Sequence, residues 1–393
     1  MSIGFELSDG FGKMREDYVF AEAGRKVAAF TERHPSRKIY RLGIGDVRGP
    51  LFPEIVDALS GACREMESAE TFRGYAPASG YDFLREAIAE YCARGGIEIS
   101  PSEAYVTDGG KNILFDVSSL FDCDVLIPSP TYPVYADGAA FFGKKIEYLV
   151  GSESDDFAPD PPRKGRYLIY LCSPSNPVGE ALGRDKLTEW VKFANDSGSL
   201  IVFDAAYESF VFSGVKSIFS IDGARNCAIE VSSLSKRSGF TGLRCGYAII
   251  PSGLTTASRS VSRAFERYCA SSDNGVAYPV QRAAQAALDP SLDAKTLERI
   301  REYSLGALAL KKAAAKRGFY VLGGSSPYTW LKCPDGFSSW EFFDYLLSLG
   351  GICCTPGCGF GEGGEGYVRF SSFAPLQSVD EAAFILSEIL RKL

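Results

Sequence analysis

Apolar residues in the middle of the chain gather in short, uninterrupted runs, and each run is followed by residues that favour turns. Five such runs lie at 103–110, 124–133, 166–177, 199–207 and 226–236. Because these runs are apolar throughout rather than alternating, we expect strands that are buried on both faces. Helical patterns separate some of the runs. This alternation predicts an α/β fold with a mostly parallel central sheet sandwiched by helices.

The pattern changes after about Thr255. Longer helical stretches are followed there by short strands with glycine turns and a closing helix, which is typical of a smaller α+β domain. The expected helices lie at 18–31, 185–197, 256–267, 297–317 and 380–393. We therefore predict a large domain at 46–285 and a small domain made of 1–45 and 286–393.

Polar side chains follow the apolar runs, at the points where the strands are expected to end. These positions are Asp108 to Lys111, Tyr132, Asn176, Asp204 and Lys236. In open α/β sheets the ligand crevice lies at the carboxyl ends of the strands. The sequence therefore predicts one site that all of these strand ends share.

The composition argues against several classes of function. The formal net charge of -7 does not favour nucleic-acid binding, and no apolar stretch is long enough to cross a membrane. His34 is the only histidine and sits in the polar turn "ERHPSRK", so histidine-based hydrolysis and histidine–metal chemistry are not expected. The 11 cysteines include no C-x-x-C pair, and the start of the chain has no export-signal pattern. We expect reduced thiols, no metal and a cytoplasmic location.

Lys236 and Asp204 carry the strongest chemical signal. Lys236 follows a buried run, and an amine in a partly dry site loses its proton more easily and attacks carbonyl groups. Asp204 ends the run "LIVFD", where a carboxylate is costly unless it is paired. Its partner could be a cation, backbone N–H groups or the protonated ring nitrogen of a ligand.

Further residues suit a phosphate. Arg244, Ser233 and Ser235 could bind one through their side chains. Backbone N–H groups at 108–111 could do the same if a helix begins there.

Three more residues suit a flat aromatic ligand. Tyr132 could stack on its ring, and Asn176 and Tyr207 could donate hydrogen bonds to a phenolic oxygen. One molecule uses a lysine, an acid, a phosphate site and these contacts together, namely pyridoxal 5′-phosphate.

At these residues the chain resembles the fold-type I pyridoxal-phosphate aminotransferases, from about Tyr18 to the C-terminus. "SPSNPVG" is similar to the family's asparagine–proline turn and "DAAY" to its ring-nitrogen aspartate and tyrosine. "SLSKRSGFTGLRCG" is similar to its lysine loop and "VRFSSF" to the segment with its carboxylate-binding arginine. The resemblance implies a seven-stranded, mostly parallel sheet, the cofactor pyridoxal 5′-phosphate and a homodimer.

The resemblance also implies roles for individual residues. Lys236 would be the Schiff base and proton shuttle, and Asp204 the partner of the pyridine nitrogen. Arg369 would bind the substrate α-carboxylate with its planar fork. The other implied cofactor contacts are Tyr132, Asn176, Tyr207, Gly110, Lys111, Ser233, Ser235, Arg244 and Tyr75. The other implied substrate contacts are Asn176, Gly45, Tyr18 and Asn274, and both Tyr75 and the region of Asn274 would reach across a dimer.

Within this family, "KSIFSIDGARNCAIEVSSLSKRSGFTGLRCG" and "TPGCGFGEGGEGYVRFSSF" most resemble the LL-diaminopimelate aminotransferases. The chain departs from that branch at three places. Ala78 stands where the branch has an acidic residue near the substrate's distal ammonium, Arg48 enters the segment "GDVRG", and Asp273 precedes Asn274. Loss of that carboxylate removes roughly 1.5–3 kcal/mol of charged hydrogen bonding.

We therefore expect an aminotransferase of lysine biosynthesis that uses LL-diaminopimelate and 2-oxoglutarate. The residues leave open another amino-acid aminotransferase that acts on a dicarboxylic or aromatic substrate, or a β-lyase with the same cofactor. A non-catalytic regulatory module on this scaffold is a further alternative, against which intact Lys236, Asp204 and Arg369 argue.

Overall fold

The computed structural model describes residues 6–14 and 18–393, so parts of the predicted small domain at 1–5 and 15–17 lie outside the described residues. Its largest sheet has seven strands in the order β2-β8-β7-β6-β5-β3-β4. The strands are β2 (Ala104–Thr107), β3 (Asp124–Ser129), β4 (Ile146–Val150), β5 (Tyr167–Cys172), β6 (Leu200–Asp204), β7 (Ala228–Ser233) and β8 (Gly246–Ile249). All strands of this sheet run in one direction except β8, which is antiparallel to both β2 and β7; this confirms the predicted mostly parallel sheet.

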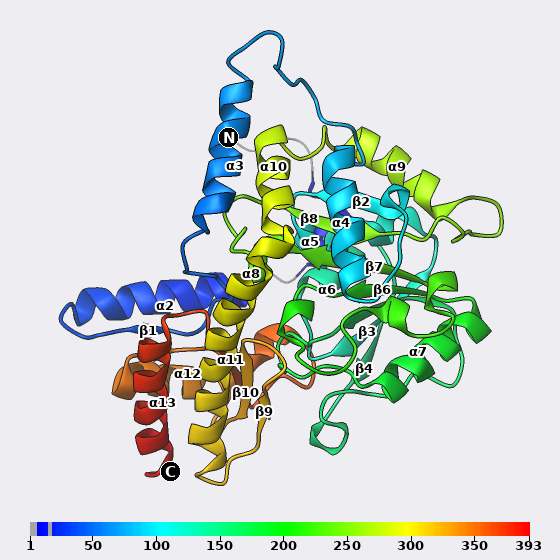
Figure 1. Ribbon diagram of the computed structural model, residues 1–393. Helices are drawn as coiled ribbons and strands as arrows, with labels where there is room; N and C mark the ends of the chain where they lie inside the picture. The colour runs from blue at the N-terminus through cyan, green and yellow to red at the C-terminus, as the bar shows by residue number, and fades with distance from the viewer. Residues whose placement is uncertain (1–5, 15–17) are drawn as a thin grey trace.

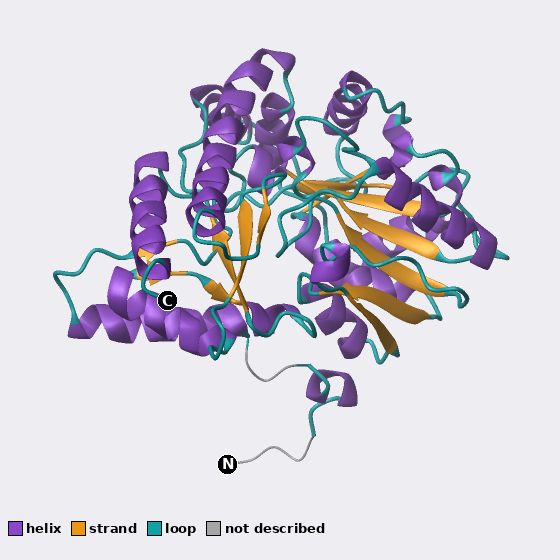
Figure 2. Cartoon of the chain, turned by 90° about the horizontal axis from the view of Figure 1, so that it is seen from below, coloured by secondary structure: helices purple, strands orange, loops and turns teal. Residues whose placement is uncertain are grey.

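Helices cover both faces of this sheet (Figure 2). One face packs on α5 (Gly110–Asp116), α6 (Val134–Phe141) and α9 (Val261–Ser272), and α7 (Arg184–Ser197) packs on the other. At the β2 and β8 edge lie α3 (Pro53–Glu65), α4 (Asp82–Arg94) and α10 (Tyr278–Ala287). With apolar helices against both faces, the strands bury residues in succession, which explains their continuous apolar runs.

The helix predicted at 256–267 was placed too early. The helix α9 begins at Val261, because Thr255 and Ser260 first pair in an antiparallel bridge. The Ser260 hydroxyl then accepts a hydrogen bond from the Arg263 N–H at 3.4 Å and caps the helix.

A second, smaller body contains an antiparallel sheet in the order β12-β13-β10-β9, drawn in yellow to red tones in Figure 1. Its strands are β9 (Val321–Gly323), β10 (Tyr328–Lys332), β12 (Thr355–Pro356) and β13 (Tyr367–Ser371). A parallel pair, β1 (Tyr40–Arg41) and β11 (Ile352–Cys353), lies beside it. The packed helices are α2 (Val19–Arg33), α11 (Asp293–Ala315), α12 (Ser339–Gly350) and α13 (Leu376–Leu390).

The long helix α11 links the two bodies. Ile300 and Tyr303 near its start pack with Val47 and Tyr207, whereas Leu310 and Ala314 near its end belong to the core of the smaller body. The boundaries at 45/46 and 285/286 stay a prediction. Over the residues that the structure describes, no helix combines the length and the apolar character needed to cross a membrane.

Candidate active site

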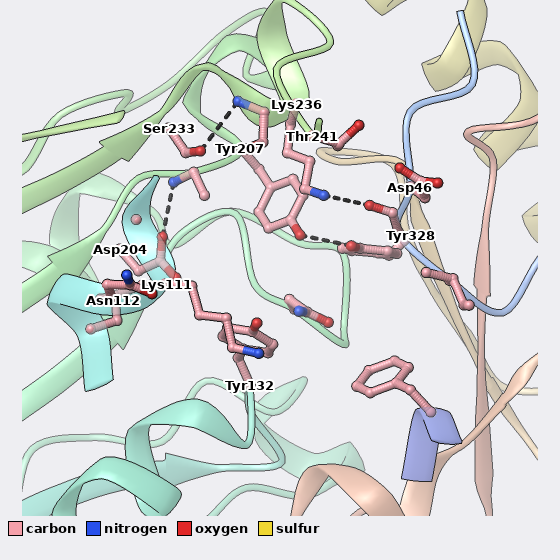
Figure 3. A pocket seen from close by; sticks show the side chains of 18 of the residues that line it. Asp46, Lys111, Asn112, Tyr132, Asp204, Tyr207, Ser233, Lys236, Thr241 and Tyr328 are labelled. Carbon is pink, nitrogen blue, oxygen red and sulfur yellow. Dashed lines mark hydrogen bonds between the residues drawn. The ribbon is translucent and has the colours of Figure 1, made fainter. Parts of the chain in front are cut away.

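A cavity of about 590 Å³ lies where the carboxyl ends of the parallel strands meet the smaller body (Figure 3). The structure brings most of the predicted site residues together in its wall. These are Tyr18, Gly45, Gly110, Lys111, Tyr132, Asn176, Asp204, Tyr207, Ser233, Ser235, Lys236, Arg244 and Arg369.

Four other residues singled out in the sequence do not line this cavity. Tyr75 is 85% exposed, and Asn274 also faces solvent. Their predicted contacts belong to a dimer, so those contacts stay predictions. Arg48 lines a separate cavity with Arg299, and Ala78 packs against the core of the central sheet.

Lys236 leaves the end of β7 on the short helix α8 (Leu234–Arg237). The Ser233 hydroxyl accepts a hydrogen bond from the Ser235 N–H at 3.2 Å, which turns the chain into α8. The Lys236 amine donates to the Gly45 carbonyl. Burial lowers the pKa of Lys236 to about 8, and the charge of Arg369 acts in the same direction, whereas Asp46 opposes the change. Much more of this amine is therefore uncharged near neutral pH than of an ordinary lysine.

Asp204 is the last residue of β6 and is only 3% exposed. Its Oδ1 accepts a hydrogen bond from the Ala206 N–H at 3.0 Å, and its Oδ2 accepts one from the Tyr135 hydroxyl at 2.5 Å. Burial raises the pKa of Asp204, and these two hydrogen bonds oppose that rise. The carboxylate is held in place but has no salt-bridge partner within the described residues, so it can pair with a ligand cation.

Two further tyrosines stand beside Lys236 (Figure 3). The Tyr207 and Tyr328 hydroxyls are hydrogen-bonded at 2.7 Å, and both side chains are buried. Tyr132 packs edge-on against Tyr135 with ring centroids 5.8 Å apart. The phenols and the Tyr132 ring give this part of the cavity both a hydrogen-bonding edge and a flat face.

One end of the cavity is suited to a phosphate. Gly110 begins α5, as expected from "DGGK", after Gly109 with a φ of +111°. The Arg244 guanidinium lies against Gly109, where an added Cβ would come within 2.3 Å of Nη2. Arg244 Nη1 also donates to the Ser235 hydroxyl at 3.3 Å. A helix start, a hydroxyl and a guanidinium together favour an anion.

Arg369 lies at the other side of the cavity on β13 and is 1% exposed. Its Nη1 donates to Asn176 Oδ1 at 2.5 Å, and its Nη2 donates to the Gly43 carbonyl at 2.7 Å. Its guanidinium lies 4.2 Å from the Tyr328 ring centroid. The Nε atom is buried without a partner in the described part of the chain. A buried, oriented cation that has no carboxylate partner in the described ranges can receive a substrate carboxylate.

Several lining residues were not singled out from the sequence. Tyr328 comes from β10, and Asp46, Thr241 and Phe20 come from loops or from α2. Tyr135, which donates a hydrogen bond to Asp204, lies on α6, three residues after Tyr132. Its closeness to Tyr132 in "TYPVY" was the only feature of the sequence that pointed to it.

The residues fit pyridoxal 5′-phosphate group by group. An amine of lowered pKa, a buried carboxylate with no salt bridge among the described residues, a phosphate-suited end and a flat tyrosine face lie in one cavity. Arg369 remains for the carboxylate of an amino acid.

Comparisons with known proteins agree with this reading. The family model described as "Aminotransferase class I and II" matches residues 37–383. An LL-diaminopimelate aminotransferase of Agathobacter rectalis is 40% identical over 397 residues, covering 96% of this chain and 98% of the relative. The LL-diaminopimelate aminotransferase structure from Chlamydomonas reinhardtii superposes with a TM-score of 0.92 at 35% identity, over 99% of this chain and 100% of the other.

A structure with lower sequence identity shares the same architecture. The aromatic aminotransferase from Pyrococcus horikoshii OT3 has a TM-score of 0.81 at 26% identity, over 93% of this chain and 99% of the other. With a family match across most of its length and a cavity that suits the cofactor, the chain belongs to the class I and II aminotransferases, which depend on pyridoxal phosphate.

Proposed function

We propose that the enzyme transfers the amino group of LL-diaminopimelate to 2-oxoglutarate, in lysine biosynthesis, and works as a homodimer. The observation that carries the proposal is the convergence of Lys236, Asp204 and Arg369 on one cavity. Relatives named LL-diaminopimelate aminotransferase, 39–40% identical over nearly the whole chain, support the choice of substrate. As a family member the enzyme acts on amino acids and 2-oxo acids.

Pyridoxal phosphate, when bound, supplies an aldehyde that combines with amino groups and a ring that takes up the electron pair left on the substrate Cα. Asp204 would bind the ring nitrogen and, as a carboxylate, favour its protonated form; burial raises the pKa of Asp204, and a cationic partner would offset that effect. The Ala206 N–H and the Tyr135 hydroxyl keep both carboxylate oxygens oriented.

Lys236 moves the proton. Its Nζ, when not bound to the cofactor, would take the proton from the substrate Cα. It would then deliver this proton to the cofactor carbon that carries the transferred amino group. The lowered pKa suits this task, because an amine with a pKa of about 8 both accepts and releases a proton readily near neutral pH. The Gly45 carbonyl that accepts from Nζ gives the free amine a defined position.

Arg369 orients the substrate. Its bond to Asn176 fixes the plane of the guanidinium, so that the remaining N–H groups can bind an α-carboxylate in a bidentate way. The rings of Tyr328 and Phe360 flank it and exclude water, which strengthens the ion pair with the substrate. A fixed carboxylate places the Cα proton within reach of Lys236.

The homodimer proposal rests on two exposed residues. Tyr75 is 85% exposed although tyrosine is usually at least partly buried, and Asn274 lies on an exposed loop after α9. In the family that the chain resembles, these positions reach a partner's site, and we propose the same here.

Ala78 favours a second candidate substrate. The resemblance implies an acidic residue at this position as the countercharge of a distal ammonium; Ala78 cannot supply that charge, and within one subunit it packs on the central sheet outside the cavity. An aminotransferase acting on another amino acid, of dicarboxylic or aromatic type, is therefore the alternative.

A half-reaction screen distinguishes the two substrates. Holoenzyme is mixed with single amino acids, and conversion to the pyridoxamine form is followed by absorbance. We expect LL-diaminopimelate to give the highest second-order rate constant. Conversion with glutamate or aspartate but none with LL-diaminopimelate would contradict the substrate proposal while leaving the aminotransferase activity in place.

A further inference from the structure

A second cavity lies behind the wall of the active site. Its volume is about 530 Å³, close to that of the active-site cavity, and none of its lining residues is shared with that cavity. It is bounded by the end of α4, the segment 214–220, β7, β8 and the first turns of α11. The reaction described above uses no side chain in it.

The two cavities share two stretches of backbone. Tyr207 lines the active site, and the next residue, Glu208, lines the second cavity. Likewise Lys236 lines the active site, and Arg237 lines the second cavity. Glu208 and Arg237 are therefore each one peptide unit away from a residue beside the cofactor site.

One group of charges in the second cavity is already paired. Asp293 accepts from Arg237 Nη2 at 2.8 Å and lies 3.3 Å from Arg94 Nε. Arg237 is 7% exposed, and its Nε is buried without a partner among the residues that the structure describes. This unpaired donor belongs to a side chain that lines the cavity.

Two carboxylates there accept hydrogen bonds only from neutral groups among the described residues, although Glu208 also lies in the field of the Arg237 cation. Glu208 accepts from the Tyr91 hydroxyl at 2.6 Å, and Glu230 accepts from the Ser217 hydroxyl at 2.7 Å and the Ile218 N–H at 3.0 Å. Neither forms a salt bridge within 6–14 and 18–393. Burial raises the pKa of Glu230 to about 7, with Glu208 adding to the effect, so a cation beside this pair would relieve an electrostatic cost.

Two cations stand at the solvent side of the same cavity. Arg184 and Lys216 are exposed, whereas Glu230 is buried and Glu208 is half-buried. Arg184 donates to the Ser220 carbonyl at 2.8 Å, and within the described chain neither cation has a carboxylate partner. The cavity thus has Glu208, Glu230 and the Asp293-paired Arg237 in its interior, and the two cations Arg184 and Lys216 at its mouth.

We propose that this second cavity binds a zwitterionic amino acid, with its ammonium group toward Glu208 and Glu230 and its carboxylate toward Arg184 and Lys216. A simple anion would meet the two carboxylates, and a simple amine would leave the two cations unpaired. Only a ligand with both charges complements both sets. Because Arg237 and Lys236 are adjacent in α8, occupancy is expected to change the KM or kcat of the transamination.

The test is calorimetry on holoenzyme reduced with borohydride, in which Lys236 can no longer exchange its cofactor. The probes are L-lysine, L-glutamate and L-leucine, with n-butylamine and butyrate as single-charge controls. We expect saturable binding of at least one amino acid, at least about tenfold tighter than either single-charge control, as expected for one additional charged hydrogen bond.

Variants assign the binding to the second cavity. Glu208→Gln and Lys216→Ala should each weaken that binding at least about tenfold, whereas Lys192→Ala, an exposed cation on α7 outside the cavity, should not. Lys216 lies on the surface, so its variant is expected to fold even if Glu208→Gln does not. Absence of amino-acid binding to the reduced enzyme, equal binding of a single-charge control, or unchanged binding by Lys216→Ala would overturn the proposal. None of these results bears on the transamination itself.

Discussion

The Tyr135 hydroxyl lies 2.5 Å from Oδ2 of Asp204, and both side chains are buried. Asp204 therefore reaches the cofactor site as an oriented carboxylate. The donor that orients it comes from α6, and the carboxylate itself comes from the end of β6.

The first prediction concerns this pair. Tyr135→Phe removes one of the two donors to Asp204, so the carboxylate becomes harder to ionise and holds the ring nitrogen less well. We expect kcat to fall about tenfold and the free energy of unfolding to fall by about 1–3 kcal/mol. Steady-state kinetics and urea unfolding measure the two effects.

Tyr170→Phe is the matched control. The Tyr170 ring is stacked on Tyr135 with centroids 4.8 Å apart, but its hydroxyl is buried without a hydrogen-bond partner among the described residues. Removing that hydroxyl should leave kcat unchanged. An equal loss of activity in both variants would show that packing, and not the bond to Asp204, is responsible.

The second prediction concerns proton transfer by Lys236. In Lys236→Ala no amine can move the Cα proton, and we expect kcat to fall about a thousandfold or more. Added methylamine should restore part of the rate, because a small amine fits the space that the side chain leaves. Appreciable turnover by Lys236→Ala without added amine would contradict the assigned role.

The third prediction follows from the lowered pKa of Lys236, about 8. Below pH 8 the amine is charged in both the folded and the unfolded apoenzyme, so the folded state carries the full cost of a buried cation. Between pH 8 and the ordinary lysine value of 10.5 the unfolded chain binds more protons, so stability rises with pH across this window. Lys236→Met should therefore stabilise the apoenzyme by about 3 kcal/mol at pH 7.

Urea unfolding of the two apoproteins at several pH values checks this prediction. The difference between Lys236→Met and the parent should shrink as the pH rises through the window and vanish above it. A difference that stays constant with pH would show that packing, and not charge burial, causes it.

The fourth prediction concerns the dimer. If Tyr75 serves the partner's site, mixing Lys236→Ala with Tyr75→Ala subunits creates hybrids in which one site has both native residues. Unfolding and refolding such a mixture should raise activity well above that of either variant alone. If Tyr75 serves its own subunit, each site in the hybrid keeps one defect, and no recovery will be seen.

The sequence was most informative where function depends on strand ends. Asp204, Asn176 and Lys236 each follow a continuous apolar run, and parallel strands necessarily bring such ends to one edge of the sheet. The same continuous apolar runs made the central sheet predictable.

The rest depends on contacts between distant segments. Tyr328 meets Tyr207 across 121 positions of sequence, from a strand of the other sheet, and nothing local distinguishes it from a core tyrosine. Arg48 is a departure in the loop after Gly45, and the sequence alone does not show that it lines a separate cavity with Arg299. The second cavity was not foreseen, because its charged residues are spread along the sequence from Arg94 on α4 to Asp293 on α11.

Peptide mapping after borohydride reduction identifies the lysine that carries the cofactor. The holoenzyme is reduced and digested, and the cofactor-bearing peptide is identified by mass spectrometry. We predict that the pyridoxyl group is on Lys236 and on no other lysine. Attachment at another lysine, or no attachment to the purified holoenzyme, would contradict it.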